Sequence, residues 1–217
     1  MKRVFMTLVV FFAAIVVQAQ DSTVETTFDG LTKQPRGLFR ESWVDLDVDF
    51  PQYTKIIPID PYFEFRAVKR NSSAAARRSN QREHYISDSN RERLIKTVSE
   101  IFNTELEKSK KFTMVAEPGP DVAIIQVGVF DIVSRVPPSA IGRSEIYLAS
   151  VGDATLVVEL KDSLSLETIY RGVERRNAAQ MGTNLTRANT VTNWAEVRRL
   201  ARRWAITMRD GLDSIHE

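Results

Sequence analysis

Histidine and cysteine, the residues most often used for nucleophilic and metal chemistry, are almost absent from this sequence. The chain has no cysteine, and its two histidines are His84 and His216. A catalytic triad or a zinc site needs a histidine that a second polar group holds in a sheltered cleft. We expect both histidines to be isolated and exposed, so the sequence favours neither hydrolase nor zinc chemistry.

Carboxylates are plentiful, but their spacing does not favour a catalytic pair or a calcium loop. Glu159 and Asp162 lie three positions apart on one expected strand, and they therefore face opposite sides of it. Three aspartates alternate within residues 45–49, but an EF-hand requires Gly and Glu where this sequence has Phe50 and Ile56. The acidic stretch is interpreted as an exposed edge. The sequence predicts no metal site and no cofactor.

Basic residues gather first between residues 67 and 84, a stretch without hydrophobic periodicity that predicts a mobile surface loop. The loop contains Lys69, Arg70, Arg77, Arg78 and Arg82. Each basic residue near an anionic surface contributes about 1 kcal/mol to binding, so this loop is the candidate contact for anionic lipid or polysaccharide. The alternative is that the loop is only a solvated connection.

Basic residues gather again on the last expected helix. Asn193 and Glu196 indicate its start, and apolar residues recur at helical spacing as far as Ile215. The arginines beside this apolar face are Arg198, Arg199, Arg202, Arg203 and Arg209. A basic amphipathic helix is typical of membrane surfaces. Trp194 and Trp204 instead favour a core helix whose arginine stems cover its rim.

The first 19 residues indicate export. Lys2 and Arg3 precede an almost unbroken apolar run over residues 4–17. The run ends in Val17-Gln18-Ala19, which has small side chains at the positions that a signal peptidase reads. This is the pattern of a secretory signal peptide, and the run is shorter than the roughly 20 residues that cross a bilayer. We expect cleavage after Ala19, no transmembrane segment in the mature chain, and no lipid anchor because there is no cysteine to modify. The expected location is the periplasm or cell envelope, as a soluble protein.

Charge gives little reason to expect a nucleic-acid partner. Residues 1–19 contain two of the 30 basic residues and none of the 28 acidic ones, so 30 minus 2 leaves 28 of each sign in the mature chain. A neutral chain has no overall field to attract nucleic acid.

We divide the chain into a signal peptide (1–19), an extended lead-in (20–52) and a single domain (53–217). Within the domain the patterns predict a strand broken by prolines over 53–66, a helix over 88–108, strands over 111–116, 122–136, 154–161 and 167–176, and a helix from residue 193. The order β-α-β-β-β-β-α predicts an α+β fold. In this fold a mainly antiparallel sheet of about five strands carries both helices on one face.

Two blocks are specific enough to compare with known families: the turn at residues 118–121, with the sequence Pro-Gly-Pro-Asp, and the paired tryptophans Trp194 and Trp204. Weaker blocks accompany them: Asp29-Gly30-Leu31, Val48-Asp49-Phe50, Tyr53-Thr54-Lys55, Asp131, Glu159, Asp162-Ser163 and Arg175-Arg176. Together they resemble domain of unknown function 3313, a family of bacterial envelope proteins that are mostly lipoproteins. The resemblance implies an envelope location and an α+β fold. It implies no activity and no catalytic residue. Because this chain lacks the lipobox cysteine, the resemblance does not imply that it is anchored by a lipid.

The sequence therefore predicts a non-enzymatic exported envelope protein that acts by binding. The expected partners are envelope proteins or anionic lipid or polysaccharide, with the loop of residues 69–82 as the first candidate contact; no oligomeric state is predicted. The alternative is an enzyme acting on envelope glycan or lipid, with a carboxylate site assembled from different strands. A pocket lined by two or more buried carboxylates would favour that alternative.

Overall fold

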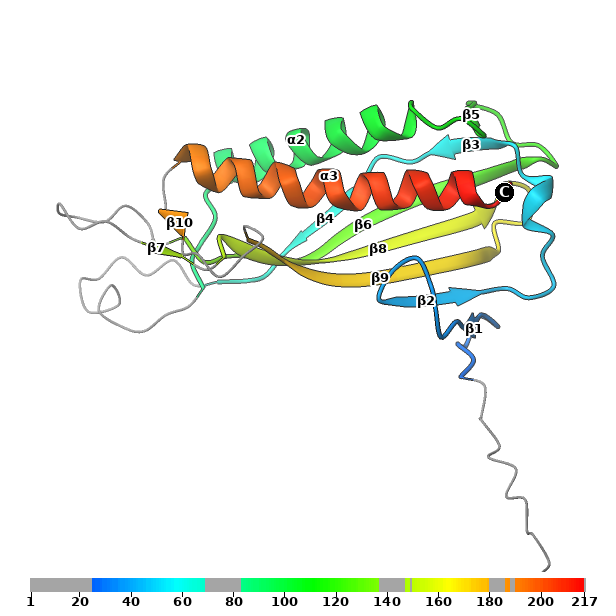
Figure 1. Ribbon diagram of the computed structural model, residues 1–217, viewed down its shortest axis with the longest axis horizontal. Helices are drawn as coiled ribbons and strands as arrows, with labels where there is room; N and C mark the ends of the chain where they lie inside the picture. Colours follow the sequence, from blue (N-terminus) through cyan, green and yellow to red (C-terminus); the bar gives the residue numbers. More distant parts are fainter. Residues whose placement is uncertain are drawn as a thin grey trace, which may run out of the picture.

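The computed structural model describes residues 25–68, 83–136, 147–148, 150–179, 186–187 and 190–216. Two helices, α2 (Asp88–Leu106) and α3 (Thr190–Ser214), run side by side along one face of a long twisted sheet (Figure 1). The predicted signal peptide, residues 1–19, lies outside the described residues. Most of the predicted basic loop, residues 69–82, lies outside them as well.

The sheet has eight strands in the order β1-β2-β9-β8-β6-β3-β5, and β4 also pairs with β6. The strands are β1 (Thr32–Lys33), β2 (Glu41–Val44), β3 (Lys55–Pro58), β4 (Tyr62–Phe65), β5 (Thr113–Met114), β6 (Val122–Ser134), β8 (Gly152–Asp162) and β9 (Thr168–Ala178). A separate antiparallel pair joins β7 (Tyr147–Leu148) to β10 (Thr186–Arg187). A short 3-10 helix, η1 (Phe50–Gln52), precedes β3.

The α+β class is confirmed, but the predicted sheet is wrong in two respects. It has eight strands rather than about five, and it is mixed rather than mainly antiparallel. Strands β3 and β4 run parallel to successive parts of β6, and β5 runs parallel to β3. Because the chain leaves the sheet after β4 and returns through α2, it can re-enter in the same direction. Part of the strand count comes from the segment with Pro58 and Pro61, which forms two strands, β3 and β4.

Three long strands, β6, β8 and β9, form the centre of the sheet. Buried and half-exposed residues alternate along β8 from Ala154 to Leu160, as predicted for a strand with one face on the core. Strand β6 has a register shift against β8 near Asp131, whose φ is 54°. The Asp131 carboxylate accepts hydrogen bonds from Arg66, at 2.6 Å, and from Arg175 of β9, at 2.5 Å. The bulge therefore links the chain that follows β4 to β9 across the sheet.

Helix α3 is a core helix, as its tryptophans predict. Trp204 is 3% exposed, and its Nε1 donates a hydrogen bond of 3.0 Å to Glu174 of β9. Ala201, Ala205 and Met208 lie buried on the same side of the helix. The helix begins at residue 190, three positions before the predicted start.

Residues 25–44 lie in the expected lead-in, and they contribute β1 and β2 to the sheet beside β9. The segment between β1 and β2 arches toward α3 (Figure 1). Its Leu38 packs on Gly211 of α3, and its Phe39 packs on Gly172 of β9; a Cβ atom at either glycine would collide with these side chains. The lack of side chains at these two glycines therefore lets the segment sit against both the helix and the sheet.

Candidate functional site

The five residues of the predicted basic contact lie outside the described residues: Lys69, Arg70, Arg77, Arg78 and Arg82.

The two histidines are far apart, as predicted, but they are half-buried rather than exposed. The backbone N–H of His84 donates to Ser134, at the end of β6, and burial lowers the pKa of the His84 imidazole. The Nε2 atom of His216 lies 2.8 Å from the carbonyl oxygen of Tyr53. Tyr53 precedes β3, and β3 pairs with the start of β6. The 13 residues of β6 span about 40 Å, so the two rings do not share a site.

Glu159 and Asp162 do not form a carboxylate pair. Glu159 accepts a hydrogen bond of 2.7 Å from Arg171, and Asp162 accepts one of 2.9 Å from the Tyr53 hydroxyl. Burial and this bond to Asp162 raise the pKa of Tyr53 to about 12. Burial opposes ionisation of Asp162, but the backbone N–H of Ser165 and the Tyr53 hydroxyl outweigh it and lower the Asp162 pKa. These bonds join the β8–β9 turn to the segment before β3.

The buried acidic residues of the described ranges each have a basic partner. The pairs are Glu105 with Arg209 (2.6 Å), Asp153 with Arg135 (2.5 Å), Glu174 with Arg176 (2.6 Å) and Glu196 with Arg199 (2.5 Å). Burial of an unpaired charge is costly, and a close ion pair offsets that cost. We assign these four carboxylates to the stability of the fold.

The arginines of α3 fall into two groups. Arg199 and Arg209 are the two that bind buried glutamates. Arg198, Arg202 and Arg203 are exposed, and no hydrogen bond or ion pair joins them to any part of the chain that the structure describes. We call these three residues the arginine face of α3.

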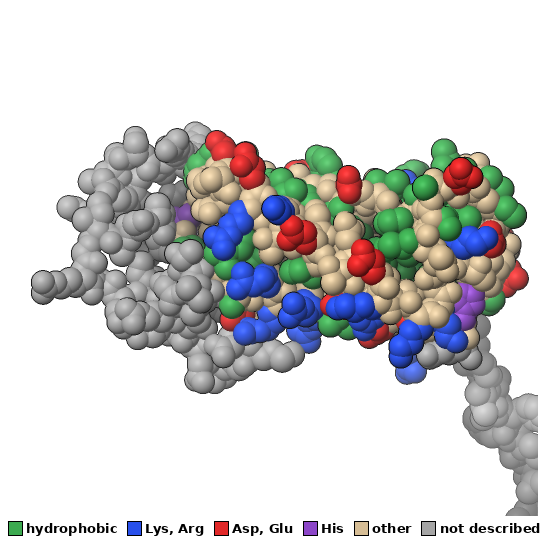
Figure 2. Space-filling view, turned by 90° about the horizontal axis from the view of Figure 1, so that it is seen from above, with side chains coloured by type: hydrophobic (Ala, Val, Ile, Leu, Met, Phe, Trp, Pro, Cys, Tyr) green, Lys and Arg blue, Asp and Glu red, His purple; other side chains and the backbone are tan. Residues whose placement is uncertain are grey.

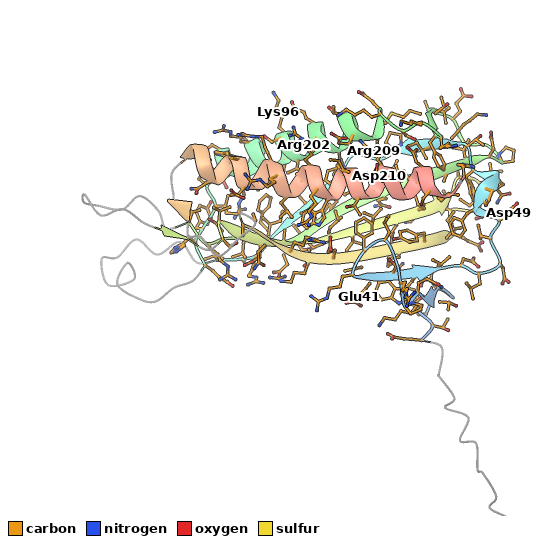
Figure 3. All side chains as sticks on the ribbon, viewed as in Figure 1. Glu41, Asp49, Lys96, Arg202, Arg209 and Asp210 are labelled. Atoms are coloured by element: carbon orange, nitrogen blue, oxygen red, sulfur yellow. The ribbon has the colours of Figure 1, made fainter. Side chains whose placement is uncertain are left out.

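The arginine face lies on the solvent side of the helix layer. In the view onto the two helices, Lys and Arg side chains gather along the side where α3 runs (Figure 2). Arg202 of α3 and Lys96 of α2 lie on the side away from the sheet, and Arg209 and Asp210 follow farther along α3 (Figure 3). The sequence pattern indicates all of these arginines but does not distinguish the three exposed ones from the paired ones, because Arg209 binds a residue 104 positions away.

Within the described ranges, no helix combines the length and the apolar character needed to cross a membrane. The same residues contain no group of three histidine, cysteine or acidic side chains that could hold a metal ion.

The model of the DUF3313 family, described as "Protein of unknown function", matches residues 20–208. The chain belongs to this family. The resemblance seen in the sequence is thus confirmed, and DUF3313 carries no assigned activity. No curated protein matches the chain.

Solved structures with a similar chain path share little sequence with this DUF3313 protein. A neuraminyllactose-binding hemagglutinin homolog from Helicobacter pylori is 11% identical, with a TM-score of 0.40 over 75% of this chain and 87% of that one. Protein XCC0632 from Xanthomonas campestris, of the DUF330 family, is 12% identical, with a TM-score of 0.38 over 72% and 81%. The PelC dodecamer from Paraburkholderia phytofirmans is 7% identical, with a TM-score of 0.37 over 75% and 89%. Likeness at this level determines neither ligand nor assembly.

Proposed function

We propose that this chain is a non-enzymatic exported envelope protein that acts by binding anionic surface polymers, and that the arginine face of α3 makes the contact. The observation that carries the proposal is the exposure of Arg198, Arg202 and Arg203 without partners among the described residues. A guanidinium group presents a planar set of donors that matches carboxylate and phosphate groups. Three such groups on one helix suit a polyanion better than a single small anion.

The expected location supports this class of partner. Residues 1–19 have the pattern of a signal peptide, and the resemblance noted in the sequence implies an envelope location. The polyanions of a bacterial envelope are phosphorylated lipid headgroups, lipopolysaccharide and cell-wall acids. If the export part of the proposal is correct, the mature chain recovered from the envelope begins at Gln20, which mass analysis of its N-terminus measures.

The buried carboxylates support binding over the alternative of an enzyme. That alternative needs two or more carboxylates free to act in one pocket. The four buried acids of the described residues are each engaged by a basic side chain within 2.6 Å. Carboxylates engaged in this way are typical of ion pairs that stabilise a fold, not of a catalytic site.

The test compares two double variants of equal charge change. Arg202→Gln/Arg203→Gln removes two charges from the arginine face. Lys110→Gln/Lys111→Gln removes two exposed charges whose backbone N–H groups contact Asp213, near the end of α3. Asp213 lies ten residues beyond Arg203, or about 15 Å along the helix, which exceeds the screening distance of about 8 Å at physiological salt.

Binding to vesicles with and without anionic lipid, and to lipopolysaccharide, is the measurement. At about 1 kcal/mol per charge, the arginine variant loses about 2 kcal/mol, or about thirtyfold in affinity at low salt. The lysine variant should retain most of its affinity, and binding of the unchanged chain should weaken as salt rises. Replacing Lys69, Arg70, Arg77, Arg78 and Arg82 with Ser measures the contribution of the basic loop. Equal losses in both double variants, or binding indifferent to salt, would contradict the arginine face as the contact.

A further inference from the structure

A cavity of about 320 Å³ lies between the second half of α3 and the sheet, away from the arginine face. Its floor includes Ile125, Val158 and Leu160 of β6 and β8, and α3 contributes Met208 and Leu212. The cavity lies inside the range of about 300–1,000 Å³ that is typical of small-molecule sites. Its lining is almost wholly apolar.

The segment between β1 and β2 forms the roof. Leu38 and Phe39 line the cavity, and they pack on Gly211 and Gly172. A backbone hydrogen bond of 2.8 Å from Gln34 to the carbonyl oxygen of Ser42 closes the base of the segment. Leu38 is nevertheless 42% exposed, so the roof contains an apolar side chain in contact with both solvent and the cavity. This is the point at which a ligand could enter with little rearrangement.

The polar groups in the wall already have partners. The hydroxyl groups of Tyr170 and Ser42 lie 3.2 Å apart, and the Ser214 hydroxyl donates to the Gly211 carbonyl oxygen at 2.7 Å. A ligand inside the cavity would therefore meet hydrocarbon surface. Because a cavity of about 150 Å³ holds benzene, a volume about twice as large has room for roughly a dozen carbon atoms.

The charges of the roof segment suit an anionic head at the mouth. Arg36 and Arg40 stand on either side of the roof pair, are exposed, and have no ion-pair partner among residues that the structure describes. The nearest acid in sequence, Glu41, belongs to the opposite face of the sheet. Ser42 of the same strand faces Tyr170, and side chains alternate along a strand.

We propose that this cavity binds the chain of a fatty acid of about a dozen carbons, with its carboxylate beside Arg36 and Arg40. The proposal uses neither Arg202 nor Arg203. It therefore stands or fails independently of the arginine face of α3.

The first test is a series of saturated fatty acids, from octanoate to hexadecanoate, titrated below their aggregation limits onto the full mature chain. Each buried methylene contributes about 0.8 kcal/mol, which is about fourfold in affinity. We expect one site per chain, an affinity that rises about fourfold per methylene up to dodecanoate, and then a plateau. An affinity independent of chain length, or one that rises steadily to hexadecanoate, overturns the proposed site.

The second test uses variants of the roof and wall. Val44→Trp places a large ring at a half-buried position of the wall, and Leu38→Asp places a carboxylate at the half-exposed roof. Both should reduce dodecanoate binding at least tenfold, and the Leu38 variant should fold because that side chain is already partly in solvent. Arg36→Gln/Arg40→Gln should weaken dodecanoate about threefold to tenfold and leave dodecanol unchanged.

Binding that survives both Val44→Trp and Leu38→Asp would place the ligand elsewhere and refute the site. If no fatty acid binds and Val44→Trp changes the sedimentation of the chain, the cavity is an interface between copies, and the proposal is wrong. Equal binding of dodecanoate and dodecanol, insensitive to Arg36 and Arg40, would refute the carboxylate position.

Discussion

Trp204 offers the sharpest test of how α3 is attached to the sheet. Its ring is 3% exposed, and its Nε1 donates to the buried carboxylate of Glu174, which also pairs with Arg176 at 2.6 Å. Two contributions can be separated. Trp204→Phe removes the N–H donor and keeps most of the apolar surface, whereas Trp204→Ala removes both.

The magnitudes follow from the two contributions. Hydrogen bonds to charged groups contribute about 1.5–3 kcal/mol, so Trp204→Phe should lower the free energy of unfolding by about 2 kcal/mol. Truncation of a buried tryptophan costs about 3–5 kcal/mol, so Trp204→Ala should cost at least that much. Arg203 is the adjacent residue, exposed and without a partner among the described residues. Arg203→Ala should cost less than about 0.5 kcal/mol.

Urea unfolding followed by far-ultraviolet circular dichroism at neutral pH measures all three variants. The dependence of unfolding free energy on urea should stay the same, because the variants do not change how much surface is exposed on unfolding. If Trp204→Phe costs no more than Arg203→Ala, the bond to Glu174 does not form in solution. If Trp204→Ala is equally mild, α3 is not part of the core and the assignment of its inner face is wrong.

Two further predictions concern residues with positive φ. Leu166, in the β8–β9 turn, has a φ of 63° and is 63% exposed. Because asparagine tolerates this left-handed conformation better than leucine, Leu166→Asn should stabilise the chain by about 0.5–1 kcal/mol in a urea melt. Leu164→Asn, at a 61% exposed position of the same turn without positive φ, is its control and should change stability by less than about 0.5 kcal/mol. Arg66 is the main group that lowers the pKa of Asp131 from 3.8 to about 2, so the ion pairs of Asp131 stabilise the fold above about pH 4 and are lost as pH falls toward 2. The melting temperature of Asp131→Asn should therefore decrease less between pH 4 and pH 2 than that of the unchanged chain. An equal decrease in both would show that these pairs contribute nothing to stability.

The elements with a long repeating pattern were predictable from the sequence. Helix α2 buries Val98, Phe102 and Leu106, which are three of the residues whose spacing predicted it. The alternation in β8 was predictable for the same reason, since one face of the strand packs on the core and the other is half-exposed. In both cases the local pattern and the packing agree, so local information was sufficient.

The edge of the sheet was not predictable in this way. Strands β1 and β2 have two and four residues, too few to show a period. They are held instead by β9 and by the contacts of Leu38 and Phe39 with two glycines far along the chain. The parallel pairing of β3 with β6 is likewise set by the route through α2, and no local signal distinguishes it from an antiparallel pair.

The candidate sites show the same limit. Residue types revealed the arginines of α3, but only the fold shows which of them bind buried acids. The cavity could not be anticipated at all, because its lining spans residues from Leu38 to Ile215 and each of them alone has the pattern of ordinary core. A site made of apolar residues carries no sequence signal beyond that of the core itself.

Packing and the proposed binding use different faces of α3, so the binding role can be tested without loss of the fold. The inner face contributes Trp204 and Met208 to the core, and the rim is fixed by the pair of Arg209 with Glu105. The outer face therefore adds little to stability, because its arginines have no partner within the described chain and cover no buried charge. Substitutions there should change binding and leave the melting temperature almost unchanged, whereas inner-face substitutions should do the reverse. A variant of Arg202 and Arg203 that lost stability and binding together would show that the outer face is also structural, and its arginines could then no longer be assigned to a partner.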